Sequence, residues 1–115
     1  MLIFFNIEAV RDYLIREGEV YSIRKNRPEG KADAVYGDFR NHRRFMKVFV
    51  KKITVINSWQ DVVPYMRRTG LYCSEDTDET NAREWILLAQ SLHNQRQPLS
   101  NQDPLYVYHI KKTEE

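Results

Sequence analysis

Residues 44–56, RFMKVFVKKITVI, form the longest strand pattern in the chain. Met46, Val48 and Val50 alternate with larger or charged side chains, and this period of two predicts a strand that turns these three residues toward a core. The opposite face is predicted to hold Phe45, Lys47, Phe49, Lys51, Ile53 and Val55. Because a strand of this length bends or carries a bulge, the pattern favours a curved sheet.

Four other stretches have strand patterns. Short apolar runs predict strands at Met1–Phe5 and Ala34–Tyr36, and alternation predicts strands at Glu19–Lys25 and Leu105–Lys111. Residues 26–31 contain a proline and a glycine and are predicted to form an exposed loop.

Three segments have helix patterns. Asn6 is predicted to cap the first helix, which ends at Gly18. Ser58 is followed three residues later by an acid, the form of a capping box, and predicts a second helix that ends at Gly70. A third helix is predicted over Ala82–Asn94, after an acidic loop.

The order of these elements is strand, helix, three strands, two helices and a final strand. The chain has 115 residues and contains no repeat or linker, which suits one domain. Consecutive strands favour an antiparallel or mixed sheet. The sequence therefore predicts an α+β fold with a single domain over residues 1–115, a small mixed or antiparallel β-barrel with about three flanking helices.

Cysteine usage and hydropathy bear on the compartment and on cofactors. The single cysteine, Cys73, cannot form an internal disulfide and suits a reducing interior. The apolar runs are far shorter than the roughly 20 residues of a membrane helix, and the N-terminus lacks the pattern of a secretory leader. We therefore expect a cytoplasmic protein without a membrane partner. The spacing of the histidines and glycines predicts neither a metal site nor a phosphate-binding loop, so no cofactor is expected.

Charge is unevenly distributed along the chain. Residues 24–52 contain ten Lys and Arg and three acids, a net charge of +7, whereas the whole chain carries +2. Cations interspersed with aromatic residues suit a polyanion whose bases can stack. The segment therefore predicts a nucleic-acid partner, with a solvated basic face as the alternative. The candidate binding residues are Ser22, Arg24, Lys25, Tyr36, Arg40, Arg43, Arg44, Lys47 and Lys51.

Three strand patterns follow one another in a fixed order along the chain. The first ends in residues 21–24 (YSIR), the second is the long basic strand, and the third is the closing strand at residues 105–110 (LYVYHI). This arrangement resembles the ASCH-type members of the PUA-like superfamily. That family has a strand of the form Gly-x-Lys-x-x-Thr-x-Arg, whose last positions are matched by Ser22 and Arg24, while Glu19 stands in place of the family's Lys. The resemblance covers nearly the whole chain and implies a small β-barrel that binds RNA or a modified nucleobase.

Individual residues of the motif and the basic segment suggest specific roles. Arg24 is expected to hold a phosphate or a base edge in a bidentate contact, and the alternative is a structural arginine paired with an acid such as Asp38. Ser22 is expected to contact the ligand, since no Gly-x-Ser-x-Gly elbow presents it as a nucleophile. Tyr36 and Phe39 lie beside cations and are expected to stack on bases.

Four other aromatic residues are interpreted as packing residues. Aromatic side chains in strands are more often core than ligand-facing, which assigns Phe45 and Phe49 to the core. Trp59 and Trp85 fall among apolar residues at helical spacing, so both are interpreted as packing residues of the predicted helices.

Three functions remain open. The leading hypothesis is binding of RNA or a modified nucleobase, with phosphates on the basic strand face and a base in a cleft near Ser22, Arg24 and Tyr36. Single-stranded or looped RNA is favoured because no predicted helix carries a basic face. The second is a small amidohydrolase that acts on an acylated cytosine nucleoside, which the resemblance implies. Its candidate participants are Glu19, Ser22, Lys25 and Glu84, and we favour a binding protein over an enzyme. The third is a charge-mediated interaction with an acidic protein, or a homodimer in which the acidic loop Glu75–Glu79 of a second copy is the partner.

Overall fold

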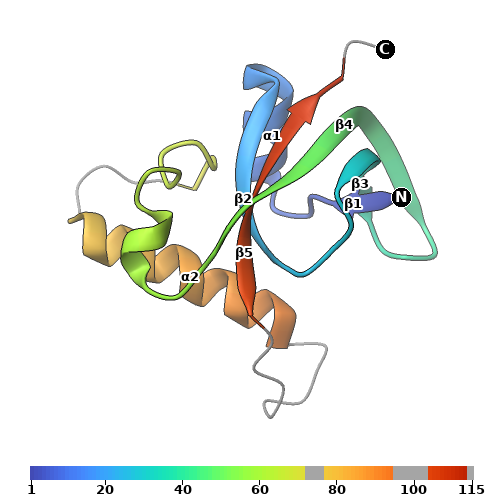
Figure 1. Cartoon of the computed structure of the whole chain (residues 1–115). Coiled ribbons are helices and arrows are strands. Elements are labelled where there is room, and N and C mark those ends of the chain that lie inside the picture. The colour runs from blue at the N-terminus through green and yellow to red at the C-terminus, as the bar shows by residue number, and fades with distance from the viewer. Residues whose placement is uncertain (72–76, 95–103, 114–115) are drawn as a thin grey trace.

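The computed structural model describes residues 1–71, 77–94 and 104–113, with the backbone alone at positions 93 and 94. Its elements are β1 (Leu2–Phe4), α1 (Glu8–Glu17), β2 (Glu19–Lys25), β3 (Gly30–Gly37), β4 (His42–Val55), the 3-10 helix η1 (Trp59–Val62), α2 (Asp78–Asn94) and β5 (Leu105–Lys112) (Figure 1). The predicted order is confirmed, although the second predicted helix is a single 3-10 turn.

The five strands form one mixed sheet in the order β1-β3-β4-β5-β2. β1 is parallel to β3, and the other three pairs are antiparallel. The register shifts between Ala34 and Val35 and again between Lys52 and Thr54, which confirms the predicted irregularity of the long strand. The sheet curls into a half-barrel whose edges are β1 and β2, so the predicted small barrel is formed only in part.

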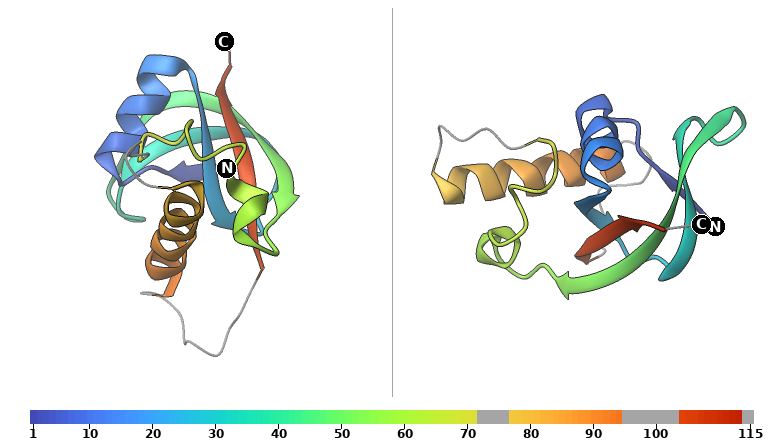
Figure 2. Two further views of the ribbon diagram at one scale, coloured as in Figure 1. Left: turned by 90° about the vertical axis from the view of Figure 1, so that its left-hand side faces the viewer. Right: turned by 90° about the horizontal axis from the view of Figure 1, so that it is seen from above.

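Apolar side chains gather in two clusters, one on each face of the sheet. The concave face packs against α1, with Leu14, Val50 and Ile110 completely buried. On the other face, η1 and α2 cover β2 and β5, with Trp85 and Val107 at the centre of the contact. Seen from above (Figure 2, right), α2 and η1 lie on one side of β5, and β1 and β3 lie on the other. Both faces of β5 are therefore covered over part of its length.

The ends of α1 are formed in different ways. Gly18 adopts the left-handed conformation with φ 75° and donates its N–H to Leu14 O, which confirms the predicted stop. The prediction that Asn6 caps the helix is wrong, because the N-cap residue is Ile7. The Asn6 side chain instead bonds to both backbone groups of Gly37. Its Nδ2 donates to Gly37 O at 2.9 Å, and its Oδ1 accepts the Gly37 N–H at 2.8 Å. Asn6 therefore joins the start of α1 to the end of β3.

The second predicted helix is interrupted by a proline. Ser58 and Asp61 form the predicted capping box, but α-helical geometry would require an N–H at Pro64 to reach Gln60 O, and proline has none. The Val63 N–H bonds to that oxygen at 3.3 Å, and the segment continues in turns. The third predicted helix begins at Asp78, earlier than the predicted Ala82. The Thr77 hydroxyl oxygen, just before the helix, accepts the Thr80 N–H at 3.2 Å.

Candidate functional site

Arg24 lies on the concave face of β2, opposite Tyr106 in β5. Its Nε donates to Ser22 Oγ at 3.0 Å, and its Nη2 donates to the Phe4 carbonyl oxygen at 2.6 Å. The guanidinium carbon lies 4.8 Å from the centre of the Phe5 ring. The two motif residues therefore contact each other, and Arg24 reaches across to β1.

Two further arginines bond to the same segment. Arg27 Nη2 donates to Leu2 O at 2.8 Å, and Arg11 Nη1 from α1 donates to Phe5 O at 3.1 Å. The carbonyl of Met1 accepts from β3, so in an extended strand the alternate carbonyls at Leu2 and Phe4 point away from β3. The guanidinium groups of Arg24 and Arg27 thus take the place of the missing strand at the edge of β1, and they connect this edge to the end of β2.

This arrangement buries positive charge. Burial and, to a smaller extent, the neighbouring Arg27 lower the pKa of Arg24 to about 9, while Tyr108 acts in the opposite direction. Arg24 is still a cation at neutral pH. The Tyr108 hydroxyl donates to Lys25 O at 3.0 Å and accepts the Arg27 N–H at 2.9 Å, and burial raises the pKa of Tyr108.

The alternative ion pair between Arg24 and Asp38 is not formed. Asp38 Oδ1 instead accepts the backbone N–H groups of Arg40 and Asn41, at 2.9 Å and 2.6 Å, and closes the turn between β3 and β4. Among the described residues, Arg24 contacts a hydroxyl and a carbonyl rather than an acid. Its role in the structure is to hold β1.

Phe49 lies on the outer face of β4 and is 47% exposed, so its assignment to the core is wrong. Phe45 does pack against the concave core, edge-on to Phe5. The difference arises because η1 and α2 cover only β2, β5 and the last part of β4, where Ile53 packs. The outer face at Phe49 is left to solvent.

Four lysines surround the Phe49 ring. Lys31 in β3 and Lys111 in β5 are its direct cross-strand partners, and Lys47 and Lys51 precede and follow it on the same face of β4. Positions with this relation lie within about 5–7 Å of one another. All four lysines are exposed. We call Phe49 and these lysines the Phe49 platform.

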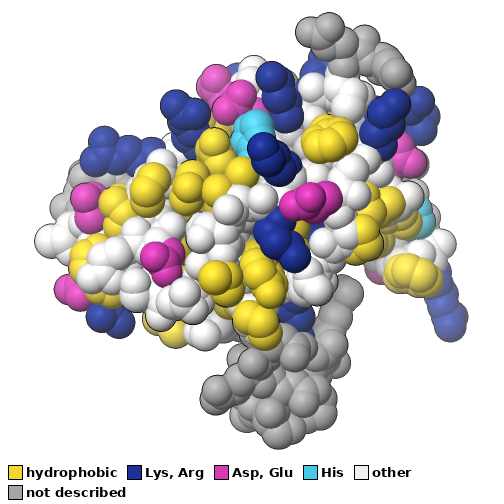
Figure 3. Space-filling model, in the orientation of Figure 1, with side chains coloured by type: hydrophobic (Ala, Val, Ile, Leu, Met, Phe, Trp, Pro, Cys, Tyr) yellow, Lys and Arg dark blue, Asp and Glu magenta, His cyan; other side chains and the backbone are white. Residues whose placement is uncertain are grey.

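Two described acids beside the platform, Asp33 and Glu19, pair with cations outside it. Asp33, opposite Lys47, forms an ion pair with Arg44 at 3.5 Å. Glu19, opposite Lys111, lies 3.6 Å from Arg68 and 3.5 Å from His109 Nε2. In the view of Figure 3, Lys and Arg side chains surround exposed hydrophobic surface over β4. The platform is therefore a positively charged surface with an aromatic ring at its centre.

The structure divides the predicted binding residues among several places. Ser22 and Arg24 face the concave side, and Tyr36 lies under the Arg11 guanidinium at 4.5 Å. Arg40 and Arg43 are exposed at the turn between β3 and β4. The cleft predicted near Ser22, Arg24 and Tyr36 coincides with neither of the two pockets described below. Of the predicted binding residues, Lys47 and Lys51 belong to the platform. Arg44 is linked to its border by the ion pair with Asp33, which lies opposite Lys47.

Sequence reasoning missed three residues of the platform. Lys31 was counted in the basic segment without a role, Phe49 was assigned to the core, and Lys111 was placed only as the end of a strand. The alternation that put Phe49 with Lys47 and Lys51 contained part of the signal. The positions of Lys31 and Lys111 opposite Phe49 depend on the register of β3 and β5 against β4, which the sequence pattern does not give.

The candidate hydrolase residues lie on different surfaces. Ser22 points to the concave face with Tyr108, whereas Glu19 and Lys25 alternate to the opposite face of β2. Glu84 on α2 lines a small pocket of about 170 Å³ with Trp85 on that opposite side. The Ser22 hydroxyl accepts a hydrogen bond from Arg24. No general base meets Ser22 among these candidates.

A larger pocket of about 400 Å³ lies where the end of β4, η1 and α2 meet, lined in part by Trp59 and Arg83. Among the described residues, no three His, Cys, Asp or Glu side chains lie together as a metal site would require. None of the described helices is both long and apolar enough to cross a membrane. The acidic residues Glu75 and Asp76, invoked for a homodimer, lie outside the described residues.

Comparisons of the chain with protein-family models, with curated proteins and with solved structures find no match. The resemblance to ASCH-type domains therefore stays a prediction, based on the short motif at residues 21–24 and on the order of the elements.

Proposed function

We propose that this protein binds single-stranded RNA on the outer face of its sheet, with a base stacked on Phe49 and phosphates held by the lysines of the Phe49 platform. The observation that carries the proposal is a half-exposed aromatic ring between four exposed lysines. An aromatic ring accepts any base by stacking, and cations beside it follow the backbone. A PUA-like, ASCH-type domain in the cytoplasm remains our expectation for its family and location.

Single strands suit this surface better than duplexes. Reading of a duplex in its major groove requires a protruding helix or ribbon with basic residues. α1 carries three acids and two arginines, and the first turn of α2 is acidic. The open, lysine-bearing outer face of the sheet suits a strand whose bases are unstacked and accessible, the form of RNA that most sequence-specific recognition targets.

Anisotropy titration of a labelled ten-nucleotide RNA against Phe49→Ala tests the proposal. Loss of one stacking contact, worth about 1–3 kcal/mol, should weaken binding by about tenfold, and Phe49→Trp should restore it. Phe39→Ala is the matched control, because Phe39 is 80% exposed but lies in the turn before β4. Circular dichroism melting establishes that each variant is folded.

The two phenylalanines make the result decisive. Equal affinities for the wild type and Phe49→Ala would exclude the platform. A loss confined to Phe39→Ala would move the binding surface to the β3–β4 turn, where Arg40 and Arg43 lie. Absence of binding by the wild type at low salt would exclude RNA binding itself.

A further inference from the structure

The pocket of about 400 Å³ lies on the same face of the sheet as Phe49. β4 leads directly from one to the other, because Ile56, which follows the last residue of β4, lines the pocket. Leu105, on the outer face of β5, forms another part of its wall. Seven residues of extended chain separate Phe49 from Ile56, a path of about 23 Å.

The lining of the pocket combines apolar and amide groups. Trp59 and Ile86 supply flat and aliphatic surface, while Asn57 at the end of β4 and Gln90 on α2 supply side-chain amides. An amide offers both a donor and an acceptor, the pair of groups that a base edge requires. Neither amide bonds to another residue in the part of the chain that the structure describes. The volume is within the range of small-ligand sites.

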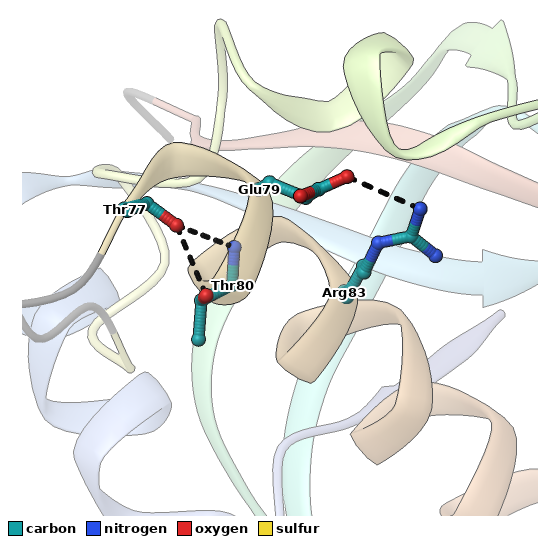
Figure 4. Close-up of polar contacts among 4 residues, drawn as sticks. All are labelled: Thr77, Glu79, Thr80 and Arg83. Atoms are coloured by element: carbon teal, nitrogen blue, oxygen red, sulfur yellow. Dashed lines mark hydrogen bonds and ion pairs between the residues drawn. The ribbon is translucent and has the colours of Figure 1, made fainter.

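The charge of the lining also suits a nucleotide. Among the described residues that line the pocket, Arg83 alone is charged, and none of them offers a carboxylate that would oppose a phosphate. Arg83 Nη2 lies 3.3 Å from Glu79 Oε1, one turn earlier on α2, and the two side chains are 60% and 52% exposed (Figure 4). An ion pair exposed to this degree is weak, so Arg83 can exchange Glu79 for a phosphate.

We infer that this pocket binds a second nucleobase of the same strand, a few nucleotides away from the base that stacks on Phe49. The inference rests on the proposed function and extends it with a second contact and a minimum length. Two contacts about 20 Å apart require a strand on the order of four to five nucleotides, within the range of site sizes for single-strand binders. Trp59 would stack on the base, Asn57 and Gln90 would bond to its edge, and Arg83 would contact a phosphate.

Protein labelled with 5-fluorotryptophan gives two fluorine resonances, from Trp59 and Trp85, which Trp59→Phe assigns. The titrants are oligoadenylates and oligouridylates of two, four, six and eight nucleotides. The Trp59 resonance should move only with strands of about four nucleotides or more, and the Trp85 resonance should stay. Gln90→Ala should abolish the Trp59 shift and weaken binding of the eight-nucleotide strand by about tenfold, while dinucleotide binding is unchanged.

The controls separate this inference from the proposed function. Ser91→Ala, at an exposed position next to Gln90 that does not line the pocket, should bind as the wild type does. Phe49-dependent binding of the long strand with an unmoved Trp59 resonance would overturn the pocket and leave the platform. A Trp59 shift produced by the dinucleotide at the same concentration would overturn the proposed spacing. Absence of binding by every strand would reject both.

Discussion

The two faces of the sheet use their cations in opposite ways. On the concave face, Arg24 and Arg27 turn inward and donate to the carbonyl oxygens of Phe4 and Leu2 at the free edge of β1. On the outer face, Lys47 and Lys51 extend into solvent beside Phe49. A guanidinium offers several donors in a rigid plane and is weakly hydrated, whereas an ammonium is strongly hydrated. The basic segment therefore supplies arginines that support the fold on one face and lysines that meet solvent on the other.

The charge that a ligand can reach on one face of the sheet is smaller than the charge of the whole segment. Arg24 and Lys25 are neighbours in the sequence, but alternation places them on different faces of β2. A net charge of +7 over residues 24–52 therefore overstates the charge available to a ligand on either face. Variants on the two faces separate these two uses of charge.

Arg24→Gln should have the largest effect on stability. It removes a hydrogen bond from a charged donor to Phe4 O and leaves that carbonyl at an unpaired strand edge. Hydrogen bonds to charged groups contribute about 1.5–3 kcal/mol, so the free energy of unfolding should fall by about 2 kcal/mol. Urea denaturation measures this, and the affinity of the folded variant for RNA should equal that of the wild type.

Lys47→Gln is the matched variant from the other face. Its side chain is exposed, so the free energy of unfolding should change by less than about 0.5 kcal/mol, while affinity for RNA falls. If Arg24→Gln instead kept full stability and lost RNA binding, Arg24 would be a ligand contact and the division between the two faces would be wrong.

Tyr108→Phe should have an intermediate effect. The change removes a donor to Lys25 O and an acceptor for the Arg27 N–H, at a cost of about 1–2 kcal/mol. The pKa of Tyr108 is raised above its ordinary value of 10.0 by burial, so the folded protein holds the phenolic proton more tightly than the unfolded chain. The contribution of the hydroxyl is therefore complete below pH 10 and is lost as pH rises through the folded-state pKa.

Denaturation of both proteins at pH 8 and at pH 11 tests the sign of this dependence. The difference in unfolding free energy between the wild type and Tyr108→Phe should shrink at the higher pH. The lowered pKa values of Arg24 and Arg27 act in the opposite direction, but both proteins contain these arginines. A difference that grows with pH would contradict the assigned role of the hydroxyl.

Local signals in the sequence predicted local structure. Gly18 ends α1, and Ser58 with Asp61 forms a capping box, because each depends on neighbours within a few residues. The alternation in β4 predicted a curved, irregular strand, and the sheet confirms it. What failed was the assignment of Asn6, whose partner Gly37 lies 31 positions away. Contacts at that separation depend on the strand order, which a single sequence does not specify.

Phe49 and Arg24 illustrate the same limit at the candidate site. The strand pattern placed Phe49 on one face with two lysines, but whether that face is buried depends on where η1 and α2 pack. The motif at residues 21–24 singled out Arg24, but its partner Phe4 O is available only because β1 is an edge strand. Both outcomes are decided by the neighbours of a strand rather than by its own residues.

Lys111 and Lys112 provide the smallest and most direct comparison of the faces. They are consecutive exposed residues of β5, but Lys111 lies opposite Phe49 and Lys112 lies opposite Val48. One lost phosphate contact lowers the dependence of log K on log salt by about 0.7 for a single strand. Lys111→Ala should therefore reduce the slope by about 0.7, and Lys112→Ala should leave it unchanged. Equal reductions of the salt slope in both variants would mean that RNA senses the total charge at the end of β5. The Phe49 platform, which lies on one face of the sheet, could not then account for binding.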